Sequence, residues 1–518
     1  MDTEVLIVGA GPTGLMLANQ LARRGIRVLI IDRHAGPSRE TRALGVQART
    51  LEIYSALGIV ARALELGTPA TGAYLWASGR RMAHVPLGDA GKDATPYPYI
   101  LVLGQDDNER IMGERLRDWG VSVQWNTELV ALDQDADGVV ATLKGADGTT
   151  RTITAAWVGG CDGARSVVRE LTGITFPGAP YEHVFFVADV QVTGSMVPSS
   201  VNVYLWKAGF HLFFPMRGTD HWRIVGILPS ELRNRDDIDF ESVAPSVQRE
   251  LGSSLAFKEC SWFSTYRIHH RRAARFRDRC CFLLGDAAHI HSPVGAQGMN
   301  TGLQDAYNLA WKLALVIRGQ AASSLLSSYE GERMPVAQRL LDTTDRGFRL
   351  AVSDSWLAGL FRTQVLARIA AFAMSGQRIQ SIAFRTISQT GIHYRHSALS
   401  QSMSLPPNAP QAGDRFPWLK LKLRRDGPVE DLFKSVDDTR FNLYVLGQPG
   451  PDAGALPLGD LLRVHVVPSD PVNDAQLHRA RIAQPSFYLV RPDGYVGLCG
   501  SRLAAEDVQR YVSERLGH

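Results

Sequence analysis

Two separated segments of the chain hold residue types that are suited to binding a ligand. Gly9, Gly11 and Gly14 form a GxGxxG pattern directly after the apolar run Val5–Val8. The second segment, LLGDAAHIHSPVGAQGMN, starts as an apolar run, places Asp286 near the end of that run and continues through a loop of His, Pro and Gly. Because strand, loop and helix occur in this order in many folds, the second segment alone does not define a ligand.

The glycine pattern predicts a dinucleotide-binding turn. Gly9 permits a tight turn, Gly11 allows the backbone to approach a pyrophosphate, and Gly14 allows a helix to pack closely on a strand. Pro12 and Thr13 lie at the start of that helix, whose unpaired N–H groups and partial positive charge attract phosphates. A glycine-rich turn without a ligand is the alternative, and the order of the surrounding elements argues against it.

Those elements have the order that a nucleotide-binding βαβ unit requires. Val5–Val8 is typical of a buried parallel strand, apolar residues within 15–22 predict a helix, and RVLII predicts a second strand. Asp32 ends that strand, where a carboxylate can accept hydrogen bonds from an adenosine ribose. The Arg-rich segment 38–59 follows, and then a helix and a β-meander. This arrangement suits a long cofactor, so it favours FAD over NAD.

Three separated motifs together resemble one family. They are the GxGxxG pattern, GCDGARSVVR at 160–169, and GDAAHIHSPVGAQGMNTGLQDAYNLAWKLA at 285–314. In order and spacing they resemble the p-hydroxybenzoate hydroxylase class of single-component FAD monooxygenases over residues 3–345. The resemblance implies bound FAD and NAD(P)H as co-substrate. The chain has no second GxGxxG, which agrees with transient nicotinamide binding at the flavin.

The resemblance implies a role for individual residues along the cofactor. Asp286 would hold the ribitol or O3′ hydroxyl, Gln105 would contact the ribitol, and Arg42 would lie along the pyrophosphate. Asp162 would help to bind FAD, although Asp162 and Arg165 are equally suited to fastening the sheet edge. The positions expected around the adenosine are Asp32, Arg33, and Leu129 or Val130.

The loop after Asp286 would shape the reacting face of the flavin. The resemblance implies that Pro293, Val294 and Gly295 stabilise the peroxide through backbone N–H groups. The helix start would follow, with N–H groups facing the flavin N1–C2 carbonyl, at Gly298, Met299 and Asn300. His289 and His291 suggest metal or acid–base chemistry by type, but the resemblance implies a loop shaped around flavin and no metal.

Residues 175–270 alternate short apolar runs with turns, which predicts antiparallel sheet. The resemblance implies that this sheet covers the flavin and forms the substrate cavity. Each aromatic residue of the sheet is also suited to a plain core position, and Arg217 to a turn. The substrate-facing candidates are Tyr74, Trp76, Tyr204, His211, Phe213, Pro215 and Trp222.

The last third of the chain begins with helices and changes character at the Pro-rich segment LPPNAPQAGDRFP. Its alternating α/β pattern resembles the thioredoxin-like domain that ends phenol hydroxylase and the polyketide aromatic hydroxylases, but it has no CxxC. The expected fold is therefore α/β, a Rossmann-like FAD-binding domain of the glutathione-reductase type with an inserted antiparallel substrate domain and a thioredoxin-like domain. The expected parts are 1–174 and 271–345 (FAD), 175–270 (substrate), 346–401 (helical connection) and 402–518 (thioredoxin-like).

Composition excludes several other classes of protein. A net charge of +4 over 518 residues, without a long block of like charge, argues against a nucleic-acid partner. Five cysteines without a CxxC predict a reduced, cytoplasmic protein, and Cys280 and Cys281 lie in an apolar run that predicts a buried strand. The apolar runs are too short to span a membrane, and the first strand leaves no room for a signal peptide. A monomer and a homodimer are both compatible with these features.

The motifs together predict an FAD- and NAD(P)H-dependent aromatic hydroxylase. The resemblance implies that a flavin C4a-hydroperoxide transfers one oxygen atom from O2 to a phenolic or polycyclic aromatic substrate, of a polyketide or antibiotic type. A Baeyer–Villiger or antibiotic-inactivating monooxygenase on the same scaffold is the alternative. An FAD oxidoreductase that does not hydroxylate and a flavin-binding protein without catalysis are further alternatives.

Overall fold

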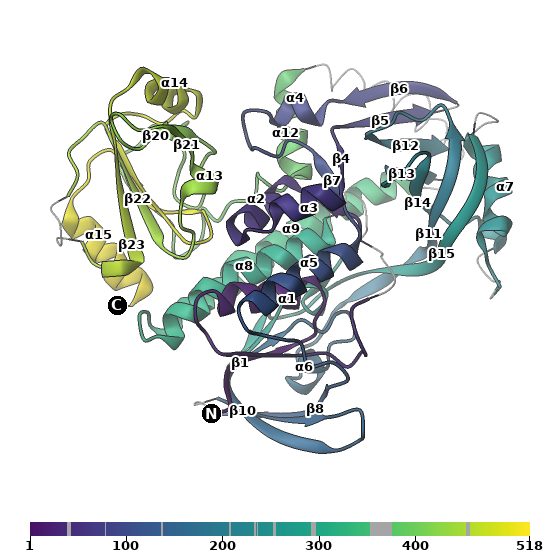
Figure 1. Cartoon of the computed structure of the whole chain (residues 1–518), viewed down its shortest axis with the longest axis horizontal. Helices are drawn as coiled ribbons and strands as arrows, with labels where there is room; N and C mark the ends of the chain where they lie inside the picture. Colours follow the sequence, from purple (N-terminus) through teal and green to yellow (C-terminus); the bar gives the residue numbers. More distant parts are fainter. Residues whose placement is uncertain are drawn as a thin grey trace.

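A computed structural model gives the fold of the chain. It describes residues 1–38, 43–77, 79–135, 138–206, 209–232, 235, 237–251, 255–291, 297–352, 376–451 and 456–517. Figure 1 shows three layered parts side by side: a C-terminal sheet on the left, a central sheet with helices, and a wide sheet on the right.

The central sheet is built on parallel strands that are almost wholly buried. β1 pairs with β2 and β10, and β10 pairs with β17, all in parallel. β9 continues the sheet from β10 in the antiparallel direction and pairs with β8. The strands are β1 (Thr3–Val8), β2 (Val28–Ile31), β8 (Glu128–Gln134), β9 (Val139–Lys144), β10 (Thr150–Gly160), β16 (Arg277–Asp278) and β17 (Cys281–Leu283). Cys280 and Cys281 are buried, as the apolar run predicts.

Helices surround the central sheet. α1 packs on β1, β2 and β10, and both α5 and α8 pack on α1. α8 is buried along nearly its whole length, so its polar side chains need internal partners. The helices are α1 (Pro12–Ala22), α2 (Ala48–Leu57), α3 (Val60–Leu66), α4 (Leu87–Gly91), α5 (Gln105–Asp118), α6 (Val167–Leu171), α8 (Gly298–Ile317), α9 (Ser327–Val352) and α12 (Gln377–Ile387). A small sheet joins β3 (Gly45–Val46), β4 (Thr68–Ala70) and β7 (Ile100–Val102).

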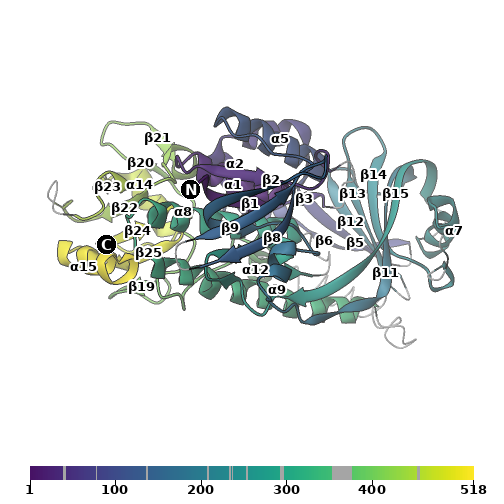
Figure 2. The same ribbon diagram turned by 90° about the horizontal axis from the view of Figure 1, so that it is seen from below.

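The wide sheet has the strand order β18-β15-β11-β14-β13-β12-β5-β6. Its pairs are antiparallel except for β12 with β5. β5 and β6 come from a segment well before residue 175 and so widen the sheet that the sequence pattern predicts. The elements are β5 (Gly72–Ala77), β6 (Arg80–Val85), β11 (Gly178–Gly194), β12 (Ser200–Trp206), β13 (Gly209–Pro215), β14 (His221–Ile227), α7 (Phe240–Leu251), β15 (Leu255–Arg272) and β18 (His289–Ile290). α7 covers the face that points away from the central sheet (Figures 1 and 2).

The C-terminal sheet has the order β19-β25-β24-β22-β23, with β22 and β23 parallel and β24 antiparallel to its neighbours β22 and β25. Buried ion pairs join this part to the central part, among them Arg491 with Glu332 and Arg415 with Glu52. The elements are β19 (Gln401–Ser402), β20 (Lys420–Lys422), β21 (Val429–Asp431), α13 (Leu432–Ser435), β22 (Phe441–Leu446), β23 (Leu462–Val467), α14 (Pro471–Arg479), β24 (Ser486–Val490), β25 (Val496–Gly500) and α15 (Ala505–Tyr511).

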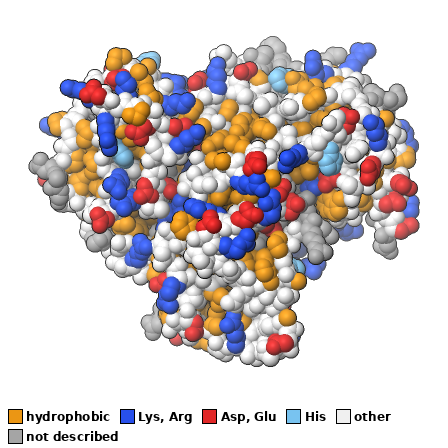
Figure 3. All heavy atoms as spheres, viewed as in Figure 1, with side chains coloured by type: hydrophobic (Ala, Val, Ile, Leu, Met, Phe, Trp, Pro, Cys, Tyr) orange, Lys and Arg blue, Asp and Glu red, His pale blue; other side chains and the backbone are white. Residues whose placement is uncertain are grey.

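Two further observations concern the charges on the surface and the length of the apolar helices. Figure 3 shows basic and acidic side chains mixed across the face that it displays. Among the described residues, no helix is both long enough and apolar enough to cross a membrane.

Candidate active site

The three sequence motifs meet at one edge of the central sheet. Val8 pairs in register with Ile31 and Gly160, and Gly160 pairs with Leu283. Because the strands are parallel, the segments that follow these four residues all leave the sheet at the same edge. This edge is where open α/β sheets bind their ligands.

Each glycine of the GxGxxG turn has different surroundings, which explain why glycine occupies the position. Gly9 has φ +101°, and a Cβ there would lie 2.4 Å from the Cys161 carbonyl oxygen. A Cβ on Gly14 would lie 1.9 Å from the Gly9 carbonyl oxygen, so this position must be glycine for the helix to pack. A Cβ on Gly11 would meet no atom of the described residues within 4 Å. The space in front of Gly11 is therefore open to a ligand that approaches the backbone.

Asp32 holds the same turn from the end of β2. Its Oδ2 accepts the Ala10 N–H at 2.7 Å, and its Oδ1 accepts the His34 N–H at 2.9 Å. The His34 ring Nδ1 also lies 2.8 Å from Oδ1. A carboxylate has further lone pairs, so this arrangement is compatible with the predicted bond to a ribose hydroxyl.

Asp162 follows β10, and its two carboxylate oxygens have different surroundings. Its Oδ2 accepts the N–H groups of Val167 and Val168, at 2.7 and 3.1 Å, and so fastens the start of α6. Its Oδ1 is buried and has no hydrogen-bond partner among the described residues. Burial raises the pKa of this carboxyl group. A buried acceptor without a partner is costly, and a ligand donor would remove that cost. Arg165 is exposed.

Asp286 lies in the turn after β17 and is accessible to solvent. Surrounding protein nevertheless desolvates its carboxyl group enough to raise its pKa. Gly285, with φ +58°, and Gly302 of α8 both pack on Thr13 of α1: a Cβ on either would lie 2.4–2.6 Å from Thr13 Oγ1. The first and third motifs are thus in direct contact, with an accessible carboxylate beside the contact.

Asp305, a residue that the sequence did not single out, organises this turn. It is fully buried in α8 and accepts the Gly285 N–H at 3.0 Å and Arg333 Nε at 2.6 Å. His289 Nε2 lies 2.7 Å from Asp305 Oδ2, the oxygen that also accepts the Gly285 N–H. Burial would raise the pKa of Asp305, but the charges of Arg333 and His289 outweigh it and hold the pKa below its usual value. The available signal was that Asp305 is the single acidic residue of α8.

The start of α8 is fixed by the side chain of Asn300. Its Oδ1 accepts the Gln47 N–H at 2.9 Å and the Thr50 hydroxyl at 2.7 Å, and its Nδ2 donates to the Gly45 carbonyl at 2.7 Å. The helix begins at Gly298, so its first N–H groups have no acceptor within the helix. The Asn300 side chain therefore orients the start of the helix.

Other predicted cofactor positions lie around the same edge. Gln105 opens α5, and its side chain donates to Glu109 at 2.8 Å. Leu129 is buried, while Val130 is exposed at a register shift between β8 and β9. Arg33 is exposed beside Asp32. Four predicted positions lie outside the described residues, namely Arg42, Pro293, Val294 and Gly295.

The predicted substrate residues are mostly found in the core under α7. Tyr204 stacks on Trp76 at 5.4 Å between ring centres and meets the edge of Phe213 at 5.2 Å. These three residues and Trp222 pack in one cluster with the apolar side of α7, and His211 Nε2 lies 2.6 Å from Glu250 of that helix. This placement favours the plain core interpretation for these five residues.

The remaining positions in this group lie at the margins of the sheet. Tyr74 stacks on His84 of the neighbouring strand at 4.3 Å. Pro215 is buried at the end of β13, and Arg217 lies exposed in the turn that follows. The opposite face of the strands carries half-buried apolar residues that pack on the central core, namely Val203, Leu205 and Leu212.

Comparisons with known proteins agree with this geometry. Residues 2–344 match the family described as FAD binding domain. The 6-methylpretetramide 4-monooxygenase of Streptomyces rimosus is 33% identical over 517 residues, which cover 96% of this chain and 91% of that protein. Pentachlorophenol 4-monooxygenase of Sphingobium chlorophenolicum is 33% identical over 469 residues, covering 89% and 83%. The structure of anhydrotetracycline hydroxylase from Streptomyces rimosus superposes with a TM-score of 0.78 at 29% identity and covers both chains completely.

These matches confirm FAD as the predicted cofactor and a monooxygenase as the predicted class of enzyme. Within the described part of the chain, the open backbone at Gly11, the Asp162 Oδ1 without a partner and the accessible carboxylate of Asp286 fit this cofactor. The chain therefore belongs to the FAD binding domain family and is an FAD-dependent monooxygenase.

Proposed function

We propose that the enzyme hydroxylates a phenolic or polycyclic aromatic compound of a polyketide or antibiotic type, with NAD(P)H and O2 as co-substrates. The convergence of three motifs at one sheet edge, beside the apolar inner face of the wide sheet, is the observation that carries this proposal. Relatives whose names specify pretetramide and pentachlorophenol substrates support the aromatic class. Bound FAD would supply the redox chemistry, by taking electrons from NAD(P)H and activating O2.

The chain would hold the cofactor along the sheet edge. Gly11 and the N-terminus of α1, with Pro12 and Thr13, would face the pyrophosphate. Asp32 would bind the ribose, and Asp286 would bind a hydroxyl group of the ribitol. The remaining positions proposed around FAD are Arg33, Arg42, Gln105, Leu129 and Asp162.

The protein groups nearest the reaction would act by position rather than as nucleophiles. The N–H groups of Gly298 and Met299 at the start of α8 would stabilise negative charge on the flavin ring. The backbone of residues 293–295 would bind oxygen near the same ring. Asn300 would keep the helix in place through its bonds to α2 and β3. Excluding water from this site strengthens each of these interactions.

The substrate would lie against the inner face of the wide sheet. Val203, Leu205 and Leu212 point to the side of the sheet that packs on the central core, and β13 contacts α9 and β4 there. Half-buried apolar side chains on such a face are suited to a flat aromatic body. This assignment replaces the aromatic residues under α7 as the substrate-facing group.

The proposal also assigns a domain to each part of the chain. A Rossmann-like FAD-binding domain would comprise residues 1–174 and 271–345, and a substrate domain 175–270 together with β5 and β6. Residues 346–401 would form a helical connection. The parallel pair β22–β23 next to the antiparallel β24–β25 supports a thioredoxin-like domain at 402–518.

Reduction of the bound flavin tests the function. The FAD-loaded enzyme is mixed anaerobically with NADPH or NADH, with and without a panel of phenols, naphthacene polyketides and rifamycins, and flavin absorbance is followed. We expect at least one aromatic compound to accelerate reduction strongly and to gain one labelled oxygen atom when 18O2 is admitted. Equal reduction rates with every compound, together with unlabelled products, would contradict the proposal. A labelled ester or lactone would indicate the Baeyer–Villiger alternative.

A further inference from the structure

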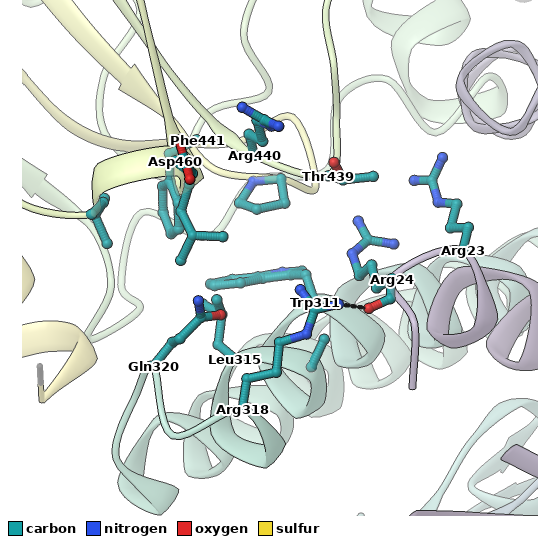
Figure 4. Close-up of a pocket in the computed structure, with 14 residues that line it drawn as sticks. Arg23, Arg24, Trp311, Leu315, Arg318, Gln320, Thr439, Arg440, Phe441 and Asp460 are labelled. Atoms are coloured by element: carbon teal, nitrogen blue, oxygen red, sulfur yellow. Dashed lines mark hydrogen bonds between the residues drawn. The ribbon is translucent and has the colours of Figure 1, made fainter. Parts of the chain in front are cut away.

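A cavity of about 410 Å³ lies between the central helices and the C-terminal sheet. Residues from the C-terminal ends of α1 and α8 form one side, and residues around β22 form the other (Figure 4). This cavity, called the arginine cavity below, is lined mainly by Arg23, Arg24, Trp311, Arg318, Arg440 and Phe441. Its size is within the range of small-molecule sites.

The charges around the arginine cavity are unequally paired. Arg23 forms an ion pair with Asp438 at 2.5 Å, and Arg440 forms one with Asp437 at 3.1 Å. Asp438 is shared, because its Oδ2 also accepts the Tyr307 hydroxyl at 2.7 Å. Arg24 and Arg318 form no ion pair with a carboxylate of the described residues, and the cavity wall offers one acidic side chain, the exposed Asp460.

Arg24 is the least compensated of these cations. It is 6% exposed, and its Nη atoms donate to neutral oxygens, at 2.8 Å to both oxygens of Gln20 and at 3.0 Å to the Asp438 carbonyl. Its Nε is buried without a hydrogen-bond partner among the described residues. Burial and the charge of Arg23 lower the pKa of Arg24 to about 10, so the group stays charged at neutral pH. A buried cation with an unused donor is unfavourable until an anion approaches it.

The C-terminal ends of α1 and α8 do not remove the excess of positive charge at the arginine cavity. The C-terminal ends of α1 and α8 carry partial negative charge, which offsets part of the positive charge nearby. The Arg24 carbonyl already accepts from Arg318, as the dashed line in Figure 4 shows. Among the described residues, Arg24 and Arg318 still have no carboxylate partner, so the arginine side of the cavity keeps an excess of positive charge.

The other side of the cavity is apolar and aromatic. Figure 4 shows Trp311 between Leu315 and Phe441. The rings of Trp311 and Phe441 meet edge to face, at 5.7 Å and 89°. Leu458 and Leu461 add to this wall. A ligand that fills the cavity therefore needs an apolar body as well as a negative group.

We propose that the arginine cavity binds a small organic anion, with a carboxylate or phosphate on the arginine side and an apolar body against Trp311 and Phe441. The cavity is a second site, separate from the flavin. The cavity reaches α8 at Trp311, 13 residues after the helix start at Gly298 that faces the candidate active site, so about 20 Å of helix separates the two.

Binding to the FAD-loaded full-length enzyme tests the proposal. Benzoate and phenyl phosphate serve as organic anions, inorganic phosphate as the bare anion, and benzyl alcohol as the neutral body. Calorimetry gives affinity and stoichiometry, and the flavin visible spectrum reports binding at the active site. Arg24→Gln and Arg440→Gln each remove one charge, the second at a half-exposed position that carries little risk for folding. Arg425→Gln is the matched control, since Arg425 is exposed elsewhere in the C-terminal part.

We expect benzoate or phenyl phosphate to bind at one site without changing the flavin spectrum. Loss of one charge-assisted hydrogen bond should weaken that binding about tenfold or more in both cavity variants, and Arg425→Gln should bind as the wild type does. Unchanged affinity in Arg24→Gln and Arg440→Gln, or no binding of any anion, would overturn the proposal. Equal affinity for inorganic phosphate and phenyl phosphate would overturn the organic part of it. None of these outcomes depends on hydroxylation activity, so the two proposals can fail separately.

Discussion

His289 Nε2 lies 2.7 Å from Asp305 Oδ2, and both side chains are buried where the Asp286 turn meets α8. The same oxygen accepts the Gly285 N–H, and the other carboxylate oxygen accepts Arg333. One carboxylate thus joins the turn after β17, the helix that follows it and α9. His289, whose residue type suggested metal or acid–base chemistry, belongs to this hydrogen-bond network around Asp305.

Asp305→Asn should destabilise the turn that carries Asp286. The amide cannot neutralise Arg333, and removing one partner of a buried ion pair costs about 3–5 kcal/mol. We expect a lower thermal midpoint and loss of FAD during gel filtration. Asp342→Asn, at an exposed position on α9, is the control and should change stability by about 0.5 kcal/mol or less. Full retention of both FAD and stability in Asp305→Asn would contradict this role.

Gly11→Ala and Gly14→Ala should separate cofactor binding from folding. Gly11 has an ordinary φ of −71°, and a Cβ there meets no atom of the described residues, so the apoprotein should unfold as the wild type does. The methyl group would occupy the approach to a phosphate, so FAD affinity should fall tenfold or more, about 1.4 kcal/mol. Flavin fluorescence titration measures that affinity. FAD affinity unchanged by Gly11→Ala would place the pyrophosphate elsewhere.

In Gly14→Ala the new Cβ would collide with the Gly9 carbonyl. Overpacking of this kind costs about 1–3 kcal/mol, so this variant should lose stability even without FAD. Urea unfolding of the two apoproteins gives the comparison. Equal urea midpoints for Gly11→Ala and Gly14→Ala would contradict the assignment of Gly11 to cofactor binding and of Gly14 to helix packing.

The sequence could predict the motifs and their strands because each is a local pattern. Val5–Val8 and Gly9–Gly14 are contiguous, so strand period and turn chemistry are visible in one segment. Asp305 and Arg333 could not be predicted, because their role arises when two helices bring them together. The wide sheet shows the same limit: strand alternation separates Leu212 from Phe213, but it does not tell which face α7 covers.

Leu212 and Phe213 are therefore a matched pair for testing the substrate face. Leu212→Ala removes apolar surface from the inner face, which should raise KM for an aromatic substrate about tenfold, since such contacts contribute about 1–3 kcal/mol. FAD affinity should stay unchanged. Phe213→Ala empties a position in the core under α7 and should cost about 3–5 kcal/mol of stability. Steady-state kinetics and urea unfolding measure the two effects. A KM effect confined to Phe213→Ala would assign the substrate to the opposite face.

Low pH should destabilise the attachment of the C-terminal part, because protonation of Glu332 removes its ion pair with Arg491. Burial would raise the pKa of this carboxyl group, but the charges of Arg491 and Lys312, at 2.6 and 2.8 Å, lower it below its usual value. A carboxyl group with a lowered folded-state pKa stabilises the fold above its unfolded pKa, about 4.3, and loses that contribution as pH falls further. We therefore expect the free energy of unfolding to fall steeply below about pH 4–5.

Glu332→Gln separates this contribution from the other carboxylates. The variant should be less stable at pH 7, because Arg491 and Lys312 lose their shared counter-ion, and its stability should vary less between about pH 5 and pH 2. Glu506→Gln, at an exposed position on α15, should keep the wild-type pH dependence. Urea unfolding at a series of pH values gives the slopes. Parallel curves for Glu332→Gln and the wild type would show that the acid sensitivity arises from other groups, because a group that sets the slope must flatten it when its proton-binding site is removed.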